Sequence, residues 1–500
     1  MENLFAAVMS ALSPMNLLYL MIGSIIGLII GVLPGLGPTF ATALVLPFTF
    51  GLEPAPALIF LAAVYASTAY GDGITSILLN VPGGPGGVAV TFDGFPLTRR
   101  GKAADALGAL VAASFVGGII GVSALIFIAP PLANFSLRIG PAEYFMLAMF
   151  GLSMVAVAAK GDTAKGLILG CLGLVFSFVG LDVTTGAVRF TLGSEFLEDG
   201  ISVISATIGL FALSQVFILA EEGGSISEEL LVITSPWRGM FAVVKYWFVT
   251  LRSAVLGVCV GMAPGIGITT ASMLSYVAEQ RMAKNPETYG KGNIRGVIAP
   301  QAASNACVSG ELIPAFSLGI PGGATAAIFL AALTMHGLRP GLSFFKDGGV
   351  LVDTVFVGMI LAQFVFLIIG AFATPLLAKI TKIPNAILVP IILALCFVGA
   401  FAVRNEILDV VVAILFGIIG FVLFKNKWPV QCIVLGLVLG EIAESNFHRA
   451  LQISSGSYGI FIKKPIALVL LVTIVGVLLW TYFGEAITTR IKRPHGGSPQ

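Results

Sequence analysis

The sequence predicts an all-α polytopic membrane protein built from two inverted repeats, each containing a helical hairpin and a broken helix. Three observations lead to this fold class. Of the 500 residues, 57% are hydrophobic and only 10% are charged, whereas a soluble domain carries about 25% charged residues. Long apolar runs alternate with short polar loops along the whole chain. Clusters of glycine and proline interrupt these runs, and they occur twice.

Composition also excludes several classes of function. The formal net charge is +2 and the chain has no basic patch with interleaved aromatic residues, so nucleic-acid binding is not supported. Five cysteines lie scattered in apolar surroundings, and only three histidines are present, so neither a disulfide framework nor a zinc centre is expected. Residues 1–14 lack the positive segment of a cleavable signal, so we expect the first apolar run to be retained.

The first repeat is predicted over residues 15–220. It opens with a hairpin over 15–52, whose two arms flank the helix-breaking run that starts at Pro34. An apolar stretch of about 20 residues crosses a bilayer, and the gaps between charges give the expected segments. These are Met15–Leu33, Thr39–Gly51, Pro54–Leu79, Ala104–Pro130, Tyr144–Ala159, Ala164–Gly180 and Ile201–Ala220.

A polar linker is predicted over residues 221–252. It begins with four glutamates and continues through Trp237, Arg238, Lys245, Tyr246 and Trp247. Tryptophan, tyrosine and basic residues together are typical of a helix that lies at the membrane interface.

The second repeat is predicted over residues 253–485, with its hairpin over 253–279 and a polar tail over 486–500. A break at Pro264–Gly267 separates the hairpin arms, and a second break at Pro321–Gly323 interrupts a later crossing. The expected segments are Ser253–Ala263, Ile268–Glu279, Ala299–Leu318, Ala324–Leu338, Val350–Leu377, Ala386–Val403, Ile407–Phe424, Val430–Glu441 and Ile466–Phe483.

The loop charges predict that the two repeats are inverted in the membrane. Lysine and arginine concentrate in cytoplasmic loops. All the basic clusters of this chain can lie on the cytoplasmic face only if both ends of each hairpin lie on the same face of the membrane. The hairpin over 15–52 then opens outward, and the hairpin over 253–279 opens inward, between Arg252 and Arg281.

The breaks themselves are duplicated. The glycines, proline and threonine of Gly27–Thr39 recur in Gly257–Thr269 at an offset of 230, with six identities, and Pro82-Gly83-Gly84 recurs as Pro321-Gly322-Gly323 at an offset of 239. The bare Gly-x-x-x-Gly pairs favour helix packing, but paired broken helices are typical of a transport site. A helix that starts after a break presents N–H groups to a carboxylate. The predicted substrate-binding residues are Pro34, Gly35, Gly37, Thr39, Pro82, Gly83, Gly84, Pro264, Gly265, Gly267, Thr269, Pro321, Gly322 and Gly323.

A second constellation lies about ten residues before each Pro-Gly-Gly. Gly71-Asp72 corresponds to Gly310-Glu311 at the offset of 239. A carboxylate at membrane depth indicates function, although each could instead tie down a local broken segment. The expected cation-binding or supporting residues are Ser67, Thr68, Asp72, Ser76, Asn80, Ser304, Asn305 and Glu311. By contrast, Arg189 is expected to be a solvated anchor, and Glu441, Glu444 and His448 to end a helix.

Two rival classes remain as alternatives. An intramembrane aspartyl protease needs two aspartates, one of them in Gly-x-Gly-Asp, whereas here Asp72 follows Ala69-Tyr70-Gly71 and its counterpart is Glu311. No phosphate-binding loop or cofactor motif is present, so no cofactor is expected. A channel is the other alternative, but inverted repeats with paired breaks favour alternating access.

The motifs resemble the large membrane subunit of the tripartite tricarboxylate transporters, the TctA family. The resemblance rests on the runs Gly31–Thr39, Tyr70–Gly84, Thr91–Leu97, Gly319–Gly323 and Met335–Gly341, and it extends over about residues 15–485.

The resemblance implies a symporter of about twelve spans in the bacterial inner membrane. Such systems take a small di- or tricarboxylate from a periplasmic solute-binding protein and work with a small four-helix membrane subunit. It also implies coupling to Na⁺, with H⁺ as the alternative, and an elevator-type movement.

Overall fold

The computed structural model describes residues 2–33, 35–158, 163–182, 185–222, 236–380 and 385–491. The chain divides into two compact units, one made of residues 1–137 and 201–426 and the other of residues 138–200 and 427–500. These units interleave along the chain, whereas the predicted repeats are consecutive, so the repeat boundaries stay a prediction. Much of the predicted linker (223–235) and of the tail (492–500) lies outside the described residues.

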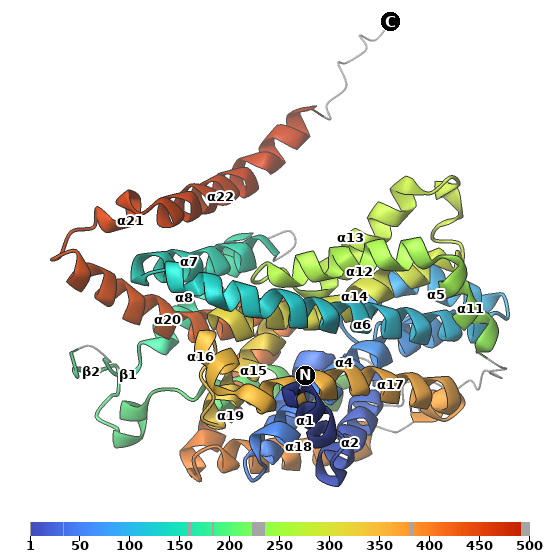
Figure 1. Ribbon diagram of the computed structural model, residues 1–500, viewed down its shortest axis with the longest axis horizontal. Coiled ribbons are helices and arrows are strands. Elements are labelled where there is room, and N and C mark those ends of the chain that lie inside the picture. Colours follow the sequence, from blue (N-terminus) through green and yellow to red (C-terminus); the bar gives the residue numbers. More distant parts are fainter. Residues whose placement is uncertain are drawn as a thin grey trace, which may run out of the picture. The chain divides into compact units, whose positions relative to one another are not determined.

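The first unit contains both predicted hairpins and both broken crossings. Its helices, shown in Figure 1, are α1 (Glu2–Ala11), α2 (Pro14–Gly31), α3 (Pro38–Val45), α4 (Pro54–Leu79), α5 (Val88–Arg99), α6 (Ala103–Phe135), α9 (Val203–Thr207), α10 (Ser214–Glu222), α11 (Trp237–Lys245), α12 (Trp247–Met262), α13 (Gly267–Met282), α14 (Arg295–Leu318), α15 (Ala324–Met335), α16 (Leu342–Asp347), α17 (Gly349–Ile380), α18 (Asn385–Ala402) and α19 (Ile407–Lys425). A π-helical stretch, η5 (Ile208–Leu213), joins α9 to α10.

Two helices, α4 and α14, form the centre of this unit. Every residue from Pro56 to Leu78 is buried in α4, and every residue from Gly296 to Ser317 is buried in α14. The two stretches correspond at the offset of 239. Helix α4 packs on α2, and α14 packs on both α12 and α6. Helices α6, α12 and α14 lie side by side in Figure 1. The duplicated segments are therefore the most buried part of the unit.

The packing of these helices repeats along with the sequence. A Cβ added at Gly31 of α2 would lie 2.6 Å from the Thr68 carbonyl oxygen, and one added at Gly261 of α12 would lie 2.7 Å from the Cys307 carbonyl oxygen. Gly31 and Gly261 differ by 230, and Thr68 and Cys307 differ by 239. Small residues thus allow close backbone approach at equivalent places, as expected for Gly-x-x-x-Gly pairs in packed membrane helices.

The predicted breaks interrupt the helices as expected. In the first hairpin α2 ends at Gly31 and α3 begins at Pro38, and in the second α12 ends at Met262 and α13 begins at Gly267. Gly35 and Gly265 both have φ of +81°, a conformation that glycine adopts without steric cost. The paired crossings also end alike, since Asn80 and Gly319, 239 residues apart, both close their helices in the left-handed conformation.

Six helices of the described chain are long and apolar enough to cross a membrane, and seven if the bent pair α11 and α12 forms one span. This agrees with a multi-pass membrane protein. The total of about twelve spans and the inversion of the repeats stay predictions. The predicted interfacial segment is helical, and α11 bends from α12 by 80°.

The second unit contains α7 (Pro141–Ala158), α8 (Thr163–Ser177), α20 (Gln431–Ile453), α21 (Ile460–Lys463) and α22 (Pro465–Ile491). It also holds a short antiparallel ladder, β1 (Gly180–Leu181) and β2 (Val188–Arg189), which the all-α prediction missed. The expectation that Glu441, Glu444 and His448 end a helix was wrong, because α20 continues to Ile453. Arg189 is not a solvated anchor either, since it forms a bidentate pair with Glu444 at 2.5 and 3.1 Å.

Candidate functional site

The candidate site lies where the hairpin of each half reaches the broken crossing of the other half. The Thr39 Oγ1 atom of α3 lies 2.8 Å from the Thr325 Oγ1 atom at the start of α15. The Ser272 hydroxyl of α13 donates to the Gly86 carbonyl at 2.7 Å. Gly86 and Thr325 are equivalent at the offset of 239. The two halves therefore contact each other reciprocally, through the elements that the sequence singles out.

Asp72 lies on the first side of this crossing. It is fully buried on α4. Its Oδ2 atom accepts a hydrogen bond from the Gly86 N–H at 3.1 Å, and its carbonyl accepts one from the Gly83 N–H, also at 3.1 Å. Its Oδ1 atom is buried without a hydrogen-bond partner among the described residues. One carboxylate oxygen thus holds the broken segment, whereas the other has no hydrogen-bond partner among the described residues.

Glu311 occupies the equivalent place on α14. Its carbonyl accepts a hydrogen bond from the Gly322 N–H at 3.3 Å, which matches the bond between Gly83 and Asp72. Its side chain differs, because the Oε2 atom accepts a hydrogen bond from the Tyr65 hydroxyl of α4 at 2.9 Å. The Cys307 thiol lies 3.9 Å from the Oε1 atom. Glu311 therefore links the two halves across their interface.

The remaining predicted supporting residues fall into two groups. The hydroxyls of Thr68 and Ser76 donate to backbone carbonyls, as helical Thr and Ser commonly do. By contrast, Ser67 Oγ, Ser304 Oγ and both amide atoms of Asn305 are buried with no partner within the described chain. Asn80 lies apart from them, exposed at the end of α4.

The Ser304 hydroxyl faces Asp72 across Gly86. A Cβ added at Gly86 would meet the Ser304 Oγ atom and would lie 3.0 Å from Asp72 Oδ2 and from the Ile268 side chain. Buried polar groups are almost always hydrogen-bonded, so the Asp72 Oδ1 and Ser304 Oγ atoms, one from each half and both unpartnered among the described residues, make this region the candidate site for a ligand. Carboxylate, hydroxyl and amide oxygens are the donors that hard cations prefer.

The predicted substrate-binding residues surround this centre. Gly84 approaches Gly37, since a Cβ added at Gly84 would lie 2.9 Å from the Gly37 Cα and 3.0 Å from Asp72 Oδ2. The Gly265 N–H donates to the Gly322 carbonyl at 2.7 Å. Pro264, Pro321 and Gly323 are buried, Pro82, Gly267 and Thr269 are half-buried, Gly35 is exposed, and Pro34 lies outside the described residues.

Sequence reasoning missed Tyr65, Ser272 and Thr325. Tyr65 precedes Asp72 by seven residues, or about two helical turns, which places both on one face of α4. Thr325 could have been found from its equivalence to Gly86. No pattern in the sequence indicates Ser272, because its role depends on how α13 packs against the first half.

One group of side chains in the second unit has the composition of a metal site. Ligand atoms of Asp182, Glu444 and His448 all lie within 4.8 Å of one another. The Arg189 guanidinium already pairs with both carboxylates, at 2.5 Å from Glu444 and 3.4 Å from Asp182. The positive charge that a metal ion would bring is thus supplied by arginine, and the cluster acts as an ion network that ties β2 to α20.

Comparison with known proteins gives a consistent result. The family model of the tripartite tricarboxylate transporter TctA family matches residues 17–435. A protein of Agrobacterium vitis, named "Uncharacterized 52.8 kDa protein in TAR-I ttuC' 3'region", is 32% identical over 470 residues, which is 94% of each chain. A second protein of that organism, named "Uncharacterized protein in TAR-II ttuC' 3'region", is 33% identical over 43% of this chain and 89% of its own length. No solved structure matches.

Proposed function

Because the chain belongs to the TctA family, as the large membrane subunit of a tripartite tricarboxylate transporter, we propose that it imports a small di- or tricarboxylate across the bacterial inner membrane by cation-driven symport. The observation that carries this proposal is the set of unpartnered buried polar atoms at the reciprocal crossing of the two halves. Paired broken helices around such a centre are the arrangement that secondary transporters use.

The coupling cation, Na⁺ in this proposal and H⁺ in the alternative, binds at Asp72. Asp72 Oδ1 has no hydrogen-bond partner in the described chain, and Ser304 Oγ of the other half lies next to Gly86, whose N–H binds the second Asp72 oxygen, Oδ2. A bound cation would satisfy both atoms and neutralise a carboxylate that is expensive to bury unpaired. Glu311 serves as a support, because both of its oxygens already have neighbours.

The substrate carboxylates bind to the backbone N–H groups that follow the breaks. Helices α3 and α15 both begin directly after a break, and the N-terminus of a helix is a ready anion site. Thr39 and Thr325 place their hydroxyls at these two helix starts, 2.8 Å apart. The Asn305 amide, predicted from the sequence to belong to the cation-binding or supporting residues, is buried and unpartnered among the described residues, and we assign its NH₂ group to the substrate as a further donor. In keeping with the family, a periplasmic binding protein delivers the substrate, and a small four-helix subunit completes the system.

Uptake into proteoliposomes tests the proposal. The chain is reconstituted with its small membrane subunit and its binding protein, whose ligand is first identified by thermal-shift screening of carboxylates. Asn305→Asp should reduce uptake at least tenfold, since an added negative charge about 4 Å from a carboxylate costs about 4 kcal/mol at an effective dielectric constant of about 20. Asp72→Asn should abolish the stimulation of uptake by an imposed Na⁺ or proton gradient.

Ser24→Ala is the matched control. Ser24 is also a fully buried serine without a partner within the described chain, and its equivalent at the offset of 230 is Ala254. Its replacement should leave uptake unchanged. Wild-type uptake and gradient dependence in both Asn305→Asp and Asp72→Asn would refute the assigned site.

A further inference from the structure

A basic cavity lies apart from the site described above, at the elbow between α11 and α12. Its volume is about 740 Å³, and Tyr246, the residue at the elbow, contributes to its wall. Four basic residues line it, Arg100, Lys284, Lys291 and Arg295, against one carboxylate, Glu287. Four positive charges minus one negative charge leave an excess of three, so the cavity attracts anions.

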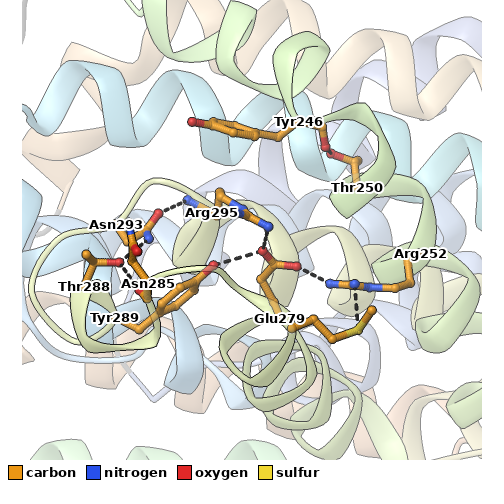
Figure 2. Close-up of polar contacts among 10 residues, drawn as sticks. Tyr246, Thr250, Arg252, Glu279, Asn285, Thr288, Tyr289, Asn293 and Arg295 are labelled. Atoms are coloured by element: carbon orange, nitrogen blue, oxygen red, sulfur yellow. Dashed lines mark hydrogen bonds and ion pairs between the residues drawn. The ribbon is translucent and has the colours of Figure 1, made fainter.

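The wall of this cavity is held in place by a buried carboxylate. Glu279 is fully buried, forms ion pairs with Arg252 and Arg295, and accepts a hydrogen bond from the Tyr289 hydroxyl at 2.9 Å. Figure 2 shows Glu279 between these partners, with the Tyr246 ring on the other side of Arg295. Burial is the largest of the effects that raise the pKa of the Tyr289 hydroxyl, and the adjacent Glu279 carboxylate adds to it. The hydroxyl therefore remains a hydrogen-bond donor at neutral pH.

A second carboxylate fixes the loop that carries the cavity's lysines. Asp93 of α5 is fully buried and accepts hydrogen bonds from the Gly292 and Asn293 N–H groups, both at 2.7 Å, and from the Tyr276 hydroxyl at 2.9 Å. These hydrogen bonds tie the end of the loop between α13 and α14, next to Lys291, to α5.

Three of the basic residues are available to a ligand. None of the ion pairs found among the described residues involves Arg100, Lys284 or Lys291. Arg295 shares its charge with Glu279, but its Nε atom is buried without a partner within the described chain. Guanidinium and ammonium groups that converge in this way suit a phosphate group.

The place of the cavity indicates where such a phosphate would come from. Helices α11 and α12 qualify as a membrane span only as a pair, bent by 80° at Tyr246. A short helix with tryptophan and basic residues at such a bend suits the membrane interface, which would put the elbow at headgroup level. Large apolar side chains are exposed on α11 and the start of α12, beside the exposed Arg238 and Lys245. They are Trp237, Phe241, Val244, Trp247 and Phe248, and Phe241 is 71% exposed. A soluble anion would leave these side chains uncovered, whereas acyl chains would cover them.

We propose that this cavity binds the phosphate headgroup of an anionic phospholipid, whose acyl chains lie against the apolar side chains of α11 and the start of α12. Basic pockets beside membrane helices are suited to such headgroups. The lipid would link the elbow of α11 and α12 to the loop between α13 and α14, at the base of the second hairpin.

Binding to the purified full-length protein in detergent tests this inference. Native mass spectrometry and thermal unfolding are followed during titration with phosphatidylglycerol, phosphatidylcholine, glycerol 3-phosphate and inorganic phosphate. Wild-type protein should retain phosphatidylglycerol and unfold at a higher temperature with it, and should do neither with phosphatidylcholine. Lys284→Gln/Lys291→Gln should weaken phosphatidylglycerol binding at least about tenfold, because each basic residue near an anionic lipid contributes a several-fold gain in affinity.

Lys463→Gln/Lys464→Gln is the matched control, since it removes two exposed lysines of the second unit. It reports the general attraction between lysine and anionic lipid, and it should bind phosphatidylglycerol like the wild type. Equal binding by wild type and Lys284→Gln/Lys291→Gln would overturn the inference. Equal stabilisation by glycerol 3-phosphate or inorganic phosphate would overturn the assignment to a lipid and leave a site for soluble phosphate compounds. Neither outcome bears on carboxylate uptake, so the two proposals can fail separately.

Discussion

Replacing Gly83 by alanine should destabilise the protein strongly, although it adds a single methyl group. The new Cβ would lie 2.6 Å from the Asp72 Cα and 2.6 Å from the Gly31 carbonyl oxygen, about 0.8 Å closer than ordinary contacts, which begin at about 3.4 Å. Both neighbours are backbone atoms of buried residues in packed helices, so neither can rotate away. Overpacking of this kind costs about 1–3 kcal/mol, and we expect the upper end because the residue is constrained on two sides.

The same displacement should impair transport beyond its effect on stability. The Gly83 N–H donates to the Asp72 carbonyl, so a shift of the broken segment changes the position of Asp72. Gly322→Ala repeats the experiment in the other half, where a Cβ would lie 2.5 Å from the Gly261 carbonyl oxygen and 2.6 Å from the Glu311 Cα. Both variants should unfold at lower temperature and lose most of their uptake.

Thermal unfolding in detergent and uptake in proteoliposomes measure the two effects. Gly51→Ala is the control, because Gly51 is exposed, has no positive φ, and a Cβ there would meet nothing within 4 Å. It should match the wild type in both assays. If Gly83→Ala or Gly322→Ala unfolded at the same temperature as Gly51→Ala, the close approach of the broken segments to α4 and α14 would be wrong.

Two further predictions concern contacts between the halves. Tyr65→Phe removes the donor to Glu311 Oε2 and should lower stability by about 1–3 kcal/mol, since it leaves a buried acceptor unpaired; thermal unfolding at the wild-type temperature would contradict this. Asp93→Ala removes the acceptor of the Gly292 and Asn293 N–H groups and should speed amide hydrogen exchange in the loop between α13 and α14. Amide exchange in α19, which does not contact Asp93, should be unchanged, and unaltered protection of the loop would show that Asp93 does not hold it.

The sequence was sufficient to locate the broken segments. Proline and glycine end helices for local steric reasons. The ends of α2, α4, α12 and α14 could therefore be predicted from the positions of these residues in the sequence. The equivalence of Asp72 and Glu311 followed from one constant offset. The family assignment, which rested on the same motifs, is confirmed by the family model that covers residues 17–435.

What could not be read from the sequence depends on tertiary packing. The contact of Ser272 with Gly86 joins residues 186 positions apart, and Ser272 does not differ locally from many other serines in the chain. The ladder of β1 and β2 was missed because two-residue strands carry no detectable alternation. The length of α20 was underestimated because Glu441 and Glu444 resemble the polar end of a span, whereas Arg189 neutralises Glu444 from a distant part of the chain.

The two halves share their backbone arrangement but differ in how they place charge. In both, the second residue of the Pro-Gly-Gly break donates to the carbonyl of the acidic residue on the buried helix. Asp72 is held by a backbone N–H of its own half and keeps one oxygen without a partner among the described residues. Glu311 is one methylene longer, and its carboxylate reaches Tyr65 of the other half. In the proposed symport, the site must hold a cation and an anionic substrate at different places, and the two halves differ in where the described residues leave a carboxylate oxygen without a partner. We therefore expect the duplicated backbone to form the frame of the site. Because Asp72 keeps an oxygen in the first half that is unpartnered among the described residues and the equivalent Glu311 does not, we expect the cation to bind on the side of the first half.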